Sequence, residues 1–340
     1  ALAWAEPVSY GAGVRLVRLN PLGGSVGNQV TAFVPPDANN PNDVRAVVEV
    51  SLATGGGRAG LAWVQHRQRT STDIQYRGGA THGSLASGKF APPVDLGPMA
   101  VPVDPQSRGM VAAAAAPDGA ISVLYRSTDG SCVEGEKGPE CARFSIRGLG
   151  EAGNTPSRGV PLAVPTPCSA PIAGYLHSAG AWYFGICSLE KSKPVTTVYG
   201  IQFEPEYAHA EPILAGRFPA GMVPSPKGAL VLGLGDGNRD AVSFTQGGRE
   251  KTVLRKTAAA SDCRDGRPVL QVRAAAGTSV ELPLAEPMSR IEGILPLAIA
   301  PERARAVWTG KAVLVAFPLG QEVVLHRYEC VAGDLERTDL

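Results

Sequence analysis

The 340-residue chain has few charged and few aromatic side chains, at 19% and 6% of its residues. Lys plus Arg (32) nearly balances Asp plus Glu (31), and no long run of like charge occurs. The chain therefore lacks the basic stripe that is typical of nucleic-acid-binding proteins. It also lacks a stretch of about 18 uninterrupted apolar residues, so no membrane-spanning helix is predicted.

Turn-forming residues are abundant, with 41 Gly and 29 Pro. One or the other interrupts almost every window long enough to show a helical period, whereas short strand patterns recur along the chain. The clearest strands flank the turn Pro117-Asp118-Gly119, because Asp-Gly between apolar runs is a strong hairpin signal. Similar units follow from Pro171 and from Gly221. The sequence therefore predicts an all-β fold built from repeats.

The spacing between the second strands of successive repeats gives the repeat length. It is about 40 to 60 residues, which fits four-stranded propeller blades with added loops. The copies lie near Trp63, Val123, Phe184, Val231, Leu270 and Val315. A single β-propeller over residues 13–335 is predicted, with six blades favoured and seven as the other count. We expect the N-terminal strand Val14–Leu19 to complete the last blade, residues 1–12 to form an N-terminal segment and residues 336–340 a tail. Tandem β-sandwiches are the alternative.

Alternate oxygen-bearing side chains follow a glycine turn at Asp236, Asn238 and Asp240, a pattern that can converge on calcium. Over about nine residues the segment resembles the latter half of the calcium loop in FG-GAP propeller blades, which implies a propeller and a calcium site. Leu232 and Leu234 stand where that family has two earlier aspartates. A plain hairpin turn is therefore preferred, with calcium as the alternative and no other cofactor expected.

Six cysteines occur without a CxxC motif, which favours disulfides over a zinc or thioredoxin-type site. Of the 15 possible connectivities, pairing of neighbours along the chain predicts Cys132–Cys141, Cys168–Cys187 and Cys263–Cys330. Disulfides are typical of compartments outside the cytoplasm. The residues Ala3-Trp4-Ala5 look like the remnant of a signal peptide. Both features predict a secreted, periplasmic or cell-surface protein.

Three glycine-rich strings match catalytic or nucleotide-binding motifs in their letters only. Residues 83–90 lack the hydroxyl of a phosphate loop because Phe90 stands in its place, and residues 148–153 precede a Pro-containing segment that cannot open a helix. Ser25 matches a nucleophile elbow, but a strand and not a helix is expected after it. The five histidines are scattered. No catalytic residue is assigned from these patterns.

In a propeller, the loops from second to third strands and those between blades leave from the same face, where ligands usually bind. The residues of these loops that could contact a ligand are Arg67, Arg69, Arg126, Asp129, Lys191, Lys193, Asp236, Asp240, Asp262, Arg264 and Asp265. Their mixed charges predict a non-enzymatic module that binds a protein or a glycan through one face. The alternative is a secreted glycan-active hydrolase or lyase with its site at the central channel.

Overall fold

A computed structural model of the chain describes most residues as β-strands, turns and short connections. The described residues are 1–8, 11–33, 44–68, 74–100, 110–128, 142–150, 159–164, 173–178, 180–190, 193–204, 207–214, 218–225, 228–235, 238–245, 248–254, 259–264, 267–273, 279–283, 305–309, 311–319 and 322–340. All of their regular elements are strands, so the all-β prediction is confirmed. None of the described segments forms a helix of the length and apolarity that crossing a bilayer requires.

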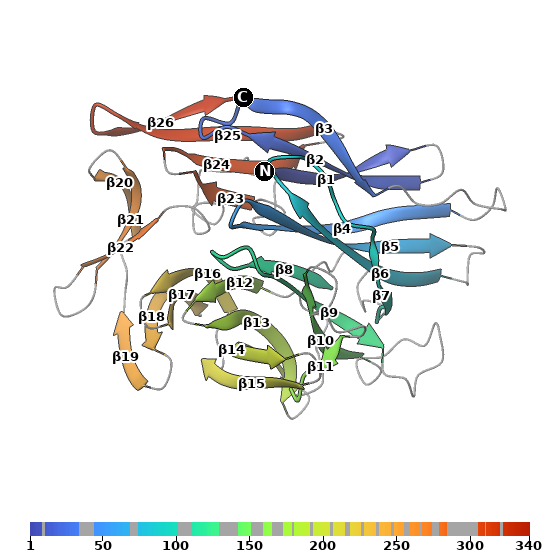
Figure 1. The fold of residues 1–340 in the computed structure, drawn as a ribbon. Helices are drawn as coiled ribbons and strands as arrows, with labels where there is room; N and C mark the ends of the chain where they lie inside the picture. Colours follow the sequence, from blue (N-terminus) through green and yellow to red (C-terminus); the bar gives the residue numbers. More distant parts are fainter. Residues whose placement is uncertain are drawn as a thin grey trace. The chain divides into compact units, whose positions relative to one another are not determined.

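These strands form six sheets in chain order, which we number sheets 1 to 6 (Figure 1). Each sheet contains an antiparallel meander, and in sheet 1 the meander β4 to β7 is extended by β2, which pairs parallel with β4. Sheet 1 contains β1 (Leu2–Val8), β2 (Gly11–Leu19), β3 (Ser25–Phe33), β4 (Val44–Gly55), β5 (Arg58–Gln68), β6 (Ile74–Ser84) and β7 (Val94–Pro98). Sheet 2 contains β8 (Val111–Ala115), β9 (Ile121–Thr128), β10 (Ala142–Leu149) and β11 (Val160–Pro161). Sheet 3 contains β12 (Ala173–Ser178), β13 (Ala181–Glu190), β14 (Lys193–Glu204) and β15 (Tyr207–Leu214).

The second half of the chain continues the same pattern. Sheet 4 contains β16 (Phe218–Ser225), β17 (Gly228–Gly235), β18 (Asn238–Thr245) and β19 (Gly248–Leu254). Sheet 5 contains β20 (Ala259–Arg264), β21 (Arg267–Arg273) and β22 (Ser279–Pro283), and sheet 6 contains β23 (Arg305–Trp308), β24 (Val313–Leu319), β25 (Glu322–Val331) and β26 (Asp334–Asp339).

The predicted position of the second strand of each repeat is confirmed in all six sheets. Its six positions fall in β5, β9, β13, β17, β21 and β24, each the second strand of its meander once β4 is taken as the first strand of sheet 1. Consecutive four-stranded meanders are the blade unit of a β-propeller, whereas β-sandwiches interleave strands between two sheets. The propeller class is therefore retained over tandem sandwiches, and the number of blades stays a prediction.

The predicted closure by an N-terminal strand is wrong in its pairing. β2 pairs with β1, β3 and the first residues of β4, so it belongs to sheet 1. Sheet 6 instead takes β26 as its fourth strand, including most of the residues expected to form a C-terminal tail. The expected N-terminal segment is likewise largely strand, since β1 occupies Leu2–Val8. A local antiparallel partner was present at each end of the chain, and pairing with it closes the shorter loop.

The N-terminal region still contacts sheet 6, through a turn and not through a strand. The chain divides into two compact units, residues 1–18 with 27–216 and residues 19–26 with 217–340. In the second unit, the Thr309 hydroxyl donates to the Pro21 carbonyl (2.7 Å) and the Arg327 guanidinium donates to the Leu22 carbonyl (3.3 Å). These bonds attach the turn at residues 20–24 to sheet 6.

Sheet 2 buries both of its faces, and its first strand, β8, is apolar at every position. On β8, Val111 and Ala113 pack toward sheet 1, whereas Ala112 and Ala114 pack toward sheet 3. Successive side chains of a strand point to opposite faces, so a strand with two covered faces has no polar positions to alternate with. The buried side chains shared by sheets 1 and 2 include Val64, Leu96, Met99, Ile121, Val123 and Tyr125.

Close packing of these sheets depends on Gly60 in β5, whose missing side chain leaves room for Ile121. A Cβ on Gly60 would lie 2.3 Å from Cγ2 of Ile121. We predict that Gly60→Ala lowers the free energy of unfolding by about 1–3 kcal/mol, the usual cost of overpacking. Denaturant titration measures it. In an Ile121→Ala background the cost of Gly60→Ala should shrink, because Cγ2 is gone; an equal cost in both backgrounds contradicts the packing argument.

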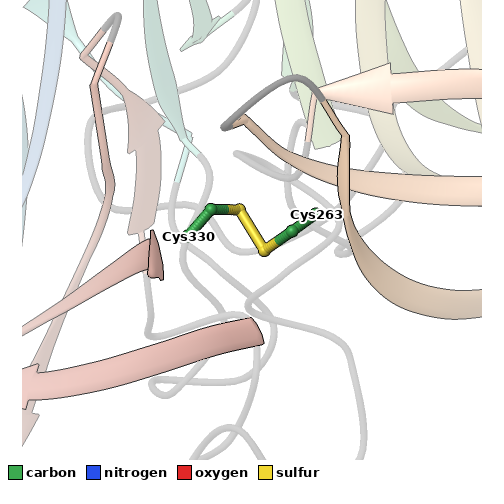
Figure 2. Close-up of a disulfide and its surroundings, with 2 residues drawn as sticks. All are labelled: Cys263 and Cys330. Carbon is green, nitrogen blue, oxygen red and sulfur yellow. A yellow bond between two sulfur atoms is a disulfide. The ribbon is translucent and has the colours of Figure 1, made fainter. Parts of the chain in front are cut away.

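One predicted disulfide is confirmed, that between Cys263 on β20 and Cys330 on β25 (Figure 2). The two Cα atoms are 5.6 Å apart, and the bond joins sheets 5 and 6 across a sequence separation of 67 residues. Cys187 is also disulfide-bonded, while its predicted partner Cys168 lies outside the described residues, as do Cys132 and Cys141. A disulfide of this kind is compatible with the extracytoplasmic location expected from the sequence.

Replacing both Cys263 and Cys330 by Ser is predicted to lower the free energy of unfolding of the chain by about 4 kcal/mol, because a cross-link that closes a loop of this length restricts the unfolded state. Urea titration of the double variant against the oxidised wild type measures the loss. The reduced wild type should be at least as unstable as the double variant, because reduction also breaks the disulfide of Cys187. Equal stability of the oxidised wild type and the variant would show that the bond does not hold sheets 5 and 6 together.

Candidate functional site

The loops that join second to third strands leave sheets 1 and 2 at a shared end. This end holds the start of β4, the end of β5, the start of β6, the start of β8 and the end of β9. We call it the Glu49 end, after the carboxylate at its centre. Four side chains at this end that carry a charge or could transfer a proton are described: Glu49, His66, Tyr76 and Arg126.

Main-chain hydrogen bonds make the Glu49 end one continuous surface of sheets 1 and 2. The N–H of Met99 donates to the carbonyl of Tyr76 (2.9 Å), and the N–H of Ala100 donates to the carbonyl of Arg126 (3.1 Å). Met99 also forms a β-bridge with Ser127. The segment after β7 therefore fastens the start of β6 to the end of β9.

Glu49 lies on β4 and is held by the backbone of the neighbouring sheet. The N–H groups of Met110 and Val111 donate to its two carboxylate oxygens, at 3.1 and 3.3 Å. Ser51, two residues along the same strand face, accepts the N–H of Ala113 (2.9 Å). Side chains of β4 thus bind the free edge of β8, and Glu49 is fixed in place as an acceptor.

Arg126 is the one ligand-binding candidate of the sequence analysis whose side chain lies among the described ones. It was predicted to lie on a loop, and this is wrong: the residue lies on β9 and is only 2% exposed. Burial lowers the pKa of its guanidinium, and the negative charge of Glu49 opposes that effect. Its buried Nε atom has no hydrogen-bond partner among the described residues.

His66 and Tyr76 face each other across β5 and β6, with ring centroids 5.3 Å apart. Burial lowers the pKa of His66, which keeps the imidazole neutral at neutral pH and able to accept a proton. Burial also raises the pKa of Tyr76, so its phenol stays protonated and able to donate. The pair therefore combines a proton acceptor with a proton donor. The sequence patterns missed it because β-pairing, and not sequence proximity, brings the two rings together.

A second polar cluster lies deeper between sheets 1 and 2. Arg147 is buried and donates to the carbonyl of Asp95 (3.1 Å), while the Asp95 carboxylate forms an exposed bidentate ion pair with Arg77. Partial burial opposes ionisation of Asp95, but the bonds from Arg77 and from the N–H of Gly97, together with the charges of Arg77 and Arg147, hold its pKa below the ordinary value. These contacts tie the edge strand β7 to sheet 2, which is a structural role.

The other ligand-binding candidates are placed by their backbones alone. Arg67 lies at the end of β5, in the Glu49 end, and Lys193 begins β14, next to a second-to-third-strand connection as expected. Asp262 and Arg264 lie instead on β20, next to the first-to-second-strand turn of sheet 5, which leaves from the opposite end of the meander. Arg69, Asp129, Lys191, Asp236 and Asp265 lie outside the described residues.

The calcium alternative gains no support from the described residues, which contain no group of three His, Cys, Asp or Glu side chains placed to bind a metal. Asn238 and Asp240 lie at the start of β18, where Gly235 pairs with Asn238, so this segment forms the expected hairpin. The FG-GAP resemblance and its calcium site stay a prediction.

Two of the glycine-rich strings adopt the turns expected of them. Residues 84–89 form a turn in which the Ser84 hydroxyl accepts the N–H groups of Ala86 and Ser87 (3.2 and 3.3 Å). Ser25 begins strand β3, so the helix that a nucleophile elbow needs does not follow it. The string at 148–153 runs out of the described residues after Gly150.

A histidine–carboxylate pair in sheet 6 has the components of a proton relay, but its histidine is buried in the sheet. Nε2 of His326 lies 3.4 Å from Oδ1 of Asp339, and the ring packs edge-on against Phe317. Burial lowers the pKa of His326; Asp339 opposes this effect and Arg337 adds to it. The imidazole is 7% exposed, and no described residue forms a hydrogen bond with its Nδ1 atom. We assign this pair to the stability of the last two strands.

The stability of the protein is predicted to fall as the pH drops below about 6.5, the ordinary pKa of histidine. The unfolded chain then binds a proton that folded His326 resists, so acid favours unfolding until the pH reaches the folded pKa. Unfolding free energy measured at several pH values should fall less steeply in His326→Gln. Asp339→Asn removes the charge that raises the pKa and should extend the fall to lower pH. Identical pH profiles in all three proteins contradict the assignment.

No protein-family model and no curated protein matches the chain. The solved structures that resemble it include a glycosyl hydrolase from Bacteroides ovatus, at 9% identity over 85% of this chain and 86% of that one with a TM-score of 0.37. A structure from the GH130 family, in which glycoside hydrolases target β-1,2-mannosidic linkages in Candida mannan, matches at 10% over 85% and 86% (TM-score 0.35). The polysaccharide lyase Uly1 matches at 10% over 86% and 57% (TM-score 0.33).

The prediction of a non-enzymatic binding module is corrected, because the structures named above are glycan-active enzymes. The alternative from the sequence analysis, a glycan-active hydrolase or lyase, is the hypothesis that remains. Likeness at these identities and TM-scores transfers no activity to this chain, whose own residues must support a function.

Proposed function

We propose that the chain is a glycan-cleaving enzyme whose reaction takes place at the Glu49 end of sheets 1 and 2. The observation that carries the proposal is the His66–Tyr76 pair, in which one neutral ring accepts a proton and the other donates one. Cleavage of a glycosidic bond needs both events, since a proton is removed from water or from the sugar and the leaving oxygen gains one.

Elimination is the route that this pair supports better than hydrolysis. Hydrolysis ordinarily uses two carboxylates, and Glu49 could supply one of them. In elimination, His66 takes the proton from the sugar carbon next to a carboxyl group, the electron pair forms the C=C bond, and the bond to the leaving oxygen breaks. Tyr76 then protonates that oxygen. Protons and electrons balance without any other reactant, so we assign the chain a lyase reaction.

Glu49 is a positioning residue in this scheme. Its carboxylate fixes the start of β8 through the N–H groups of Met110 and Val111, and it provides a counter-charge for Arg126. It thereby keeps the ends of sheets 1 and 2 in register around the reacting pair. The glycan partner expected from the sequence, and a location outside the cytoplasm, both fit this proposal.

His66→Gln and Tyr76→Phe are predicted to lower kcat by about 10² to 10⁴-fold, the usual contribution of general acid–base catalysis. Activity is measured on a panel of neutral and acidic polysaccharides, with the ultraviolet absorbance of unsaturated ends for elimination and the count of reducing ends for any cleavage. Because the pKa of His66 is lowered, the base stays unprotonated at pH values below the ordinary pKa of histidine. We therefore expect kcat/KM to stay constant down to a pH below about 6.5.

His82→Gln is the matched control, because His82 lies on β6 at the opposite end of the same sheet, paired with Gly60. It should keep the wild-type rate. The proposal fails if no polysaccharide is cleaved, or if the His66 and Tyr76 variants are as active as His82→Gln. Reducing ends without unsaturated ends would replace the lyase assignment by hydrolysis.

A further inference from the structure

The fourth strand of sheet 6, β26, buries little of its own surface. Every residue of β26 whose side chain is described is exposed, and so are Leu340 after it and residues 331–333 before it. The neighbouring strand β25, by contrast, buries His326 and Tyr328. Burial of apolar surface is the main force that keeps a strand in a fold, so β26 separates from its sheet at a lower cost in free energy than a core strand does.

Backbone pairing attaches β26 to a single strand. Among the described strands it pairs only with β25. The register places His326 opposite Asp339, with 3.4 Å between Nε2 and Oδ1. It also places Glu329 opposite Glu336, and like charges directly opposite each other weaken strand pairing. The attachment of β26 therefore depends on the hydrogen bonds of one strand pair.

The turn that joins β25 to β26 is strained. Val331 pairs with Asp334, so the turn consists of Ala332 and Gly333 alone. Both have a positive φ, 52° and 95°, which is the pattern of a type I′ turn. Glycine adopts this region freely, whereas in alanine the Cβ comes too close to the next carbonyl oxygen. Ala332 is the only non-glycine residue with a positive φ in the described part of the chain, and its strain lasts as long as the hairpin is closed.

The disulfide anchors β25 just before this turn. Cys330 on β25 is bonded to Cys263 on β20, so sheet 5 keeps β25 in place whether or not β26 is paired with it. The strained turn is therefore the point at which sheet 6 opens, and β26 is the segment that leaves.

A second copy of the chain supplies the partner that the vacated edge of β25 requires. A strand edge with unpaired N–H and C=O groups is a template for another strand. The β26 strand of a second copy repeats the register with β25, the His326–Asp339 contact and the approach to β20. Two closed monomers and two copies that exchange β26 thus make the same contacts. They differ in the turn, which is extended and free of the strain at Ala332 after exchange, and in the entropy cost of association.

We propose that two copies of the chain exchange β26 and form a domain-swapped dimer in which Ala332 and Gly333 are the hinge. Short hinge loops under strain favour such exchange over a closed monomer. The proposal is independent of the reaction at the Glu49 end and assigns a partner to the exposed strand of sheet 6.

Size-exclusion chromatography with light scattering measures the dimer after incubation of the full chain at micromolar to millimolar concentration, below the temperature of unfolding. Ala332→Asn is expected to lower the association constant about tenfold or more, because Asn-Gly fits a type I′ turn and both turns that open on exchange then hold less strain. Ala332→Val should raise the dimer fraction, since a β-branched residue is less compatible with a positive φ. Ala86→Asn is the matched control, because Ala86 lies in an exposed turn without a positive φ, and it should leave association unchanged.

A double variant identifies the exchanged strand. Arg327→Cys together with Thr338→Cys places two thiols at one cross-strand pair of β25 and β26. In the swapped dimer, oxidation joins the two chains, so the isolated dimer runs as a covalent dimer in non-reducing denaturing electrophoresis. The isolated monomer, in which both thiols belong to one chain, runs as a single chain, and reduction converts both fractions to single chains.

The proposal is overturned if the wild-type chain stays monomeric over the whole concentration range, or if Ala332→Asn associates as tightly as Ala86→Asn. It is also overturned if the oxidised dimer separates into single chains, which would mean that the copies associate through another surface. Where the double cysteine variant fails to fold by circular dichroism, the comparison of Ala332→Asn, Ala332→Val and Ala86→Asn decides.

Discussion

The burial of sheet 2 on both faces is the constraint on which the described architecture of the first unit depends. Its strands pack against sheet 1 on one side and sheet 3 on the other, so alternate residues have no solvent face to occupy. This demand explains the alanines of β8 and the glycine at position 60, which admit close approach. Sheet 2 nevertheless buries a few polar side chains within its strands, among them Ser122, Ser145 and Arg147.

At the Glu49 end, side chains of β4 bind the backbone of β8. Glu49 and Ser51 use their side chains to satisfy the N–H groups of β8, which has no neighbouring strand on that edge in sheet 2. The same carboxylate balances Arg126 in part. The carboxylate that satisfies these backbone donors thus also places a negative charge near Arg126.

The two units are held together internally by different means. In the first, apolar contact between consecutive sheets dominates among the described residues. In the second, a disulfide joins sheets 5 and 6, and the turn at residues 20–24 is attached to sheet 6 by side-chain bonds to its carbonyls. His326 lies on β25 with its imidazole buried, and its lowered pKa is expected to make the stability of the fold fall at acidic pH.

The sequence by itself determined the all-β class and the recurrence of the second strand in each meander, because hairpin turns and apolar runs are local. It predicted the Cys263–Cys330 bond by pairing neighbours along the chain, a choice that spacing alone does not fix. It could not determine that Val14–Leu19 pairs within sheet 1, since an edge strand accepts any partner with free N–H and C=O groups. Nor could it find the His66–Tyr76 pair or the burial of Arg126. Those depend on which strands lie opposite each other, and only the tertiary structure decided that.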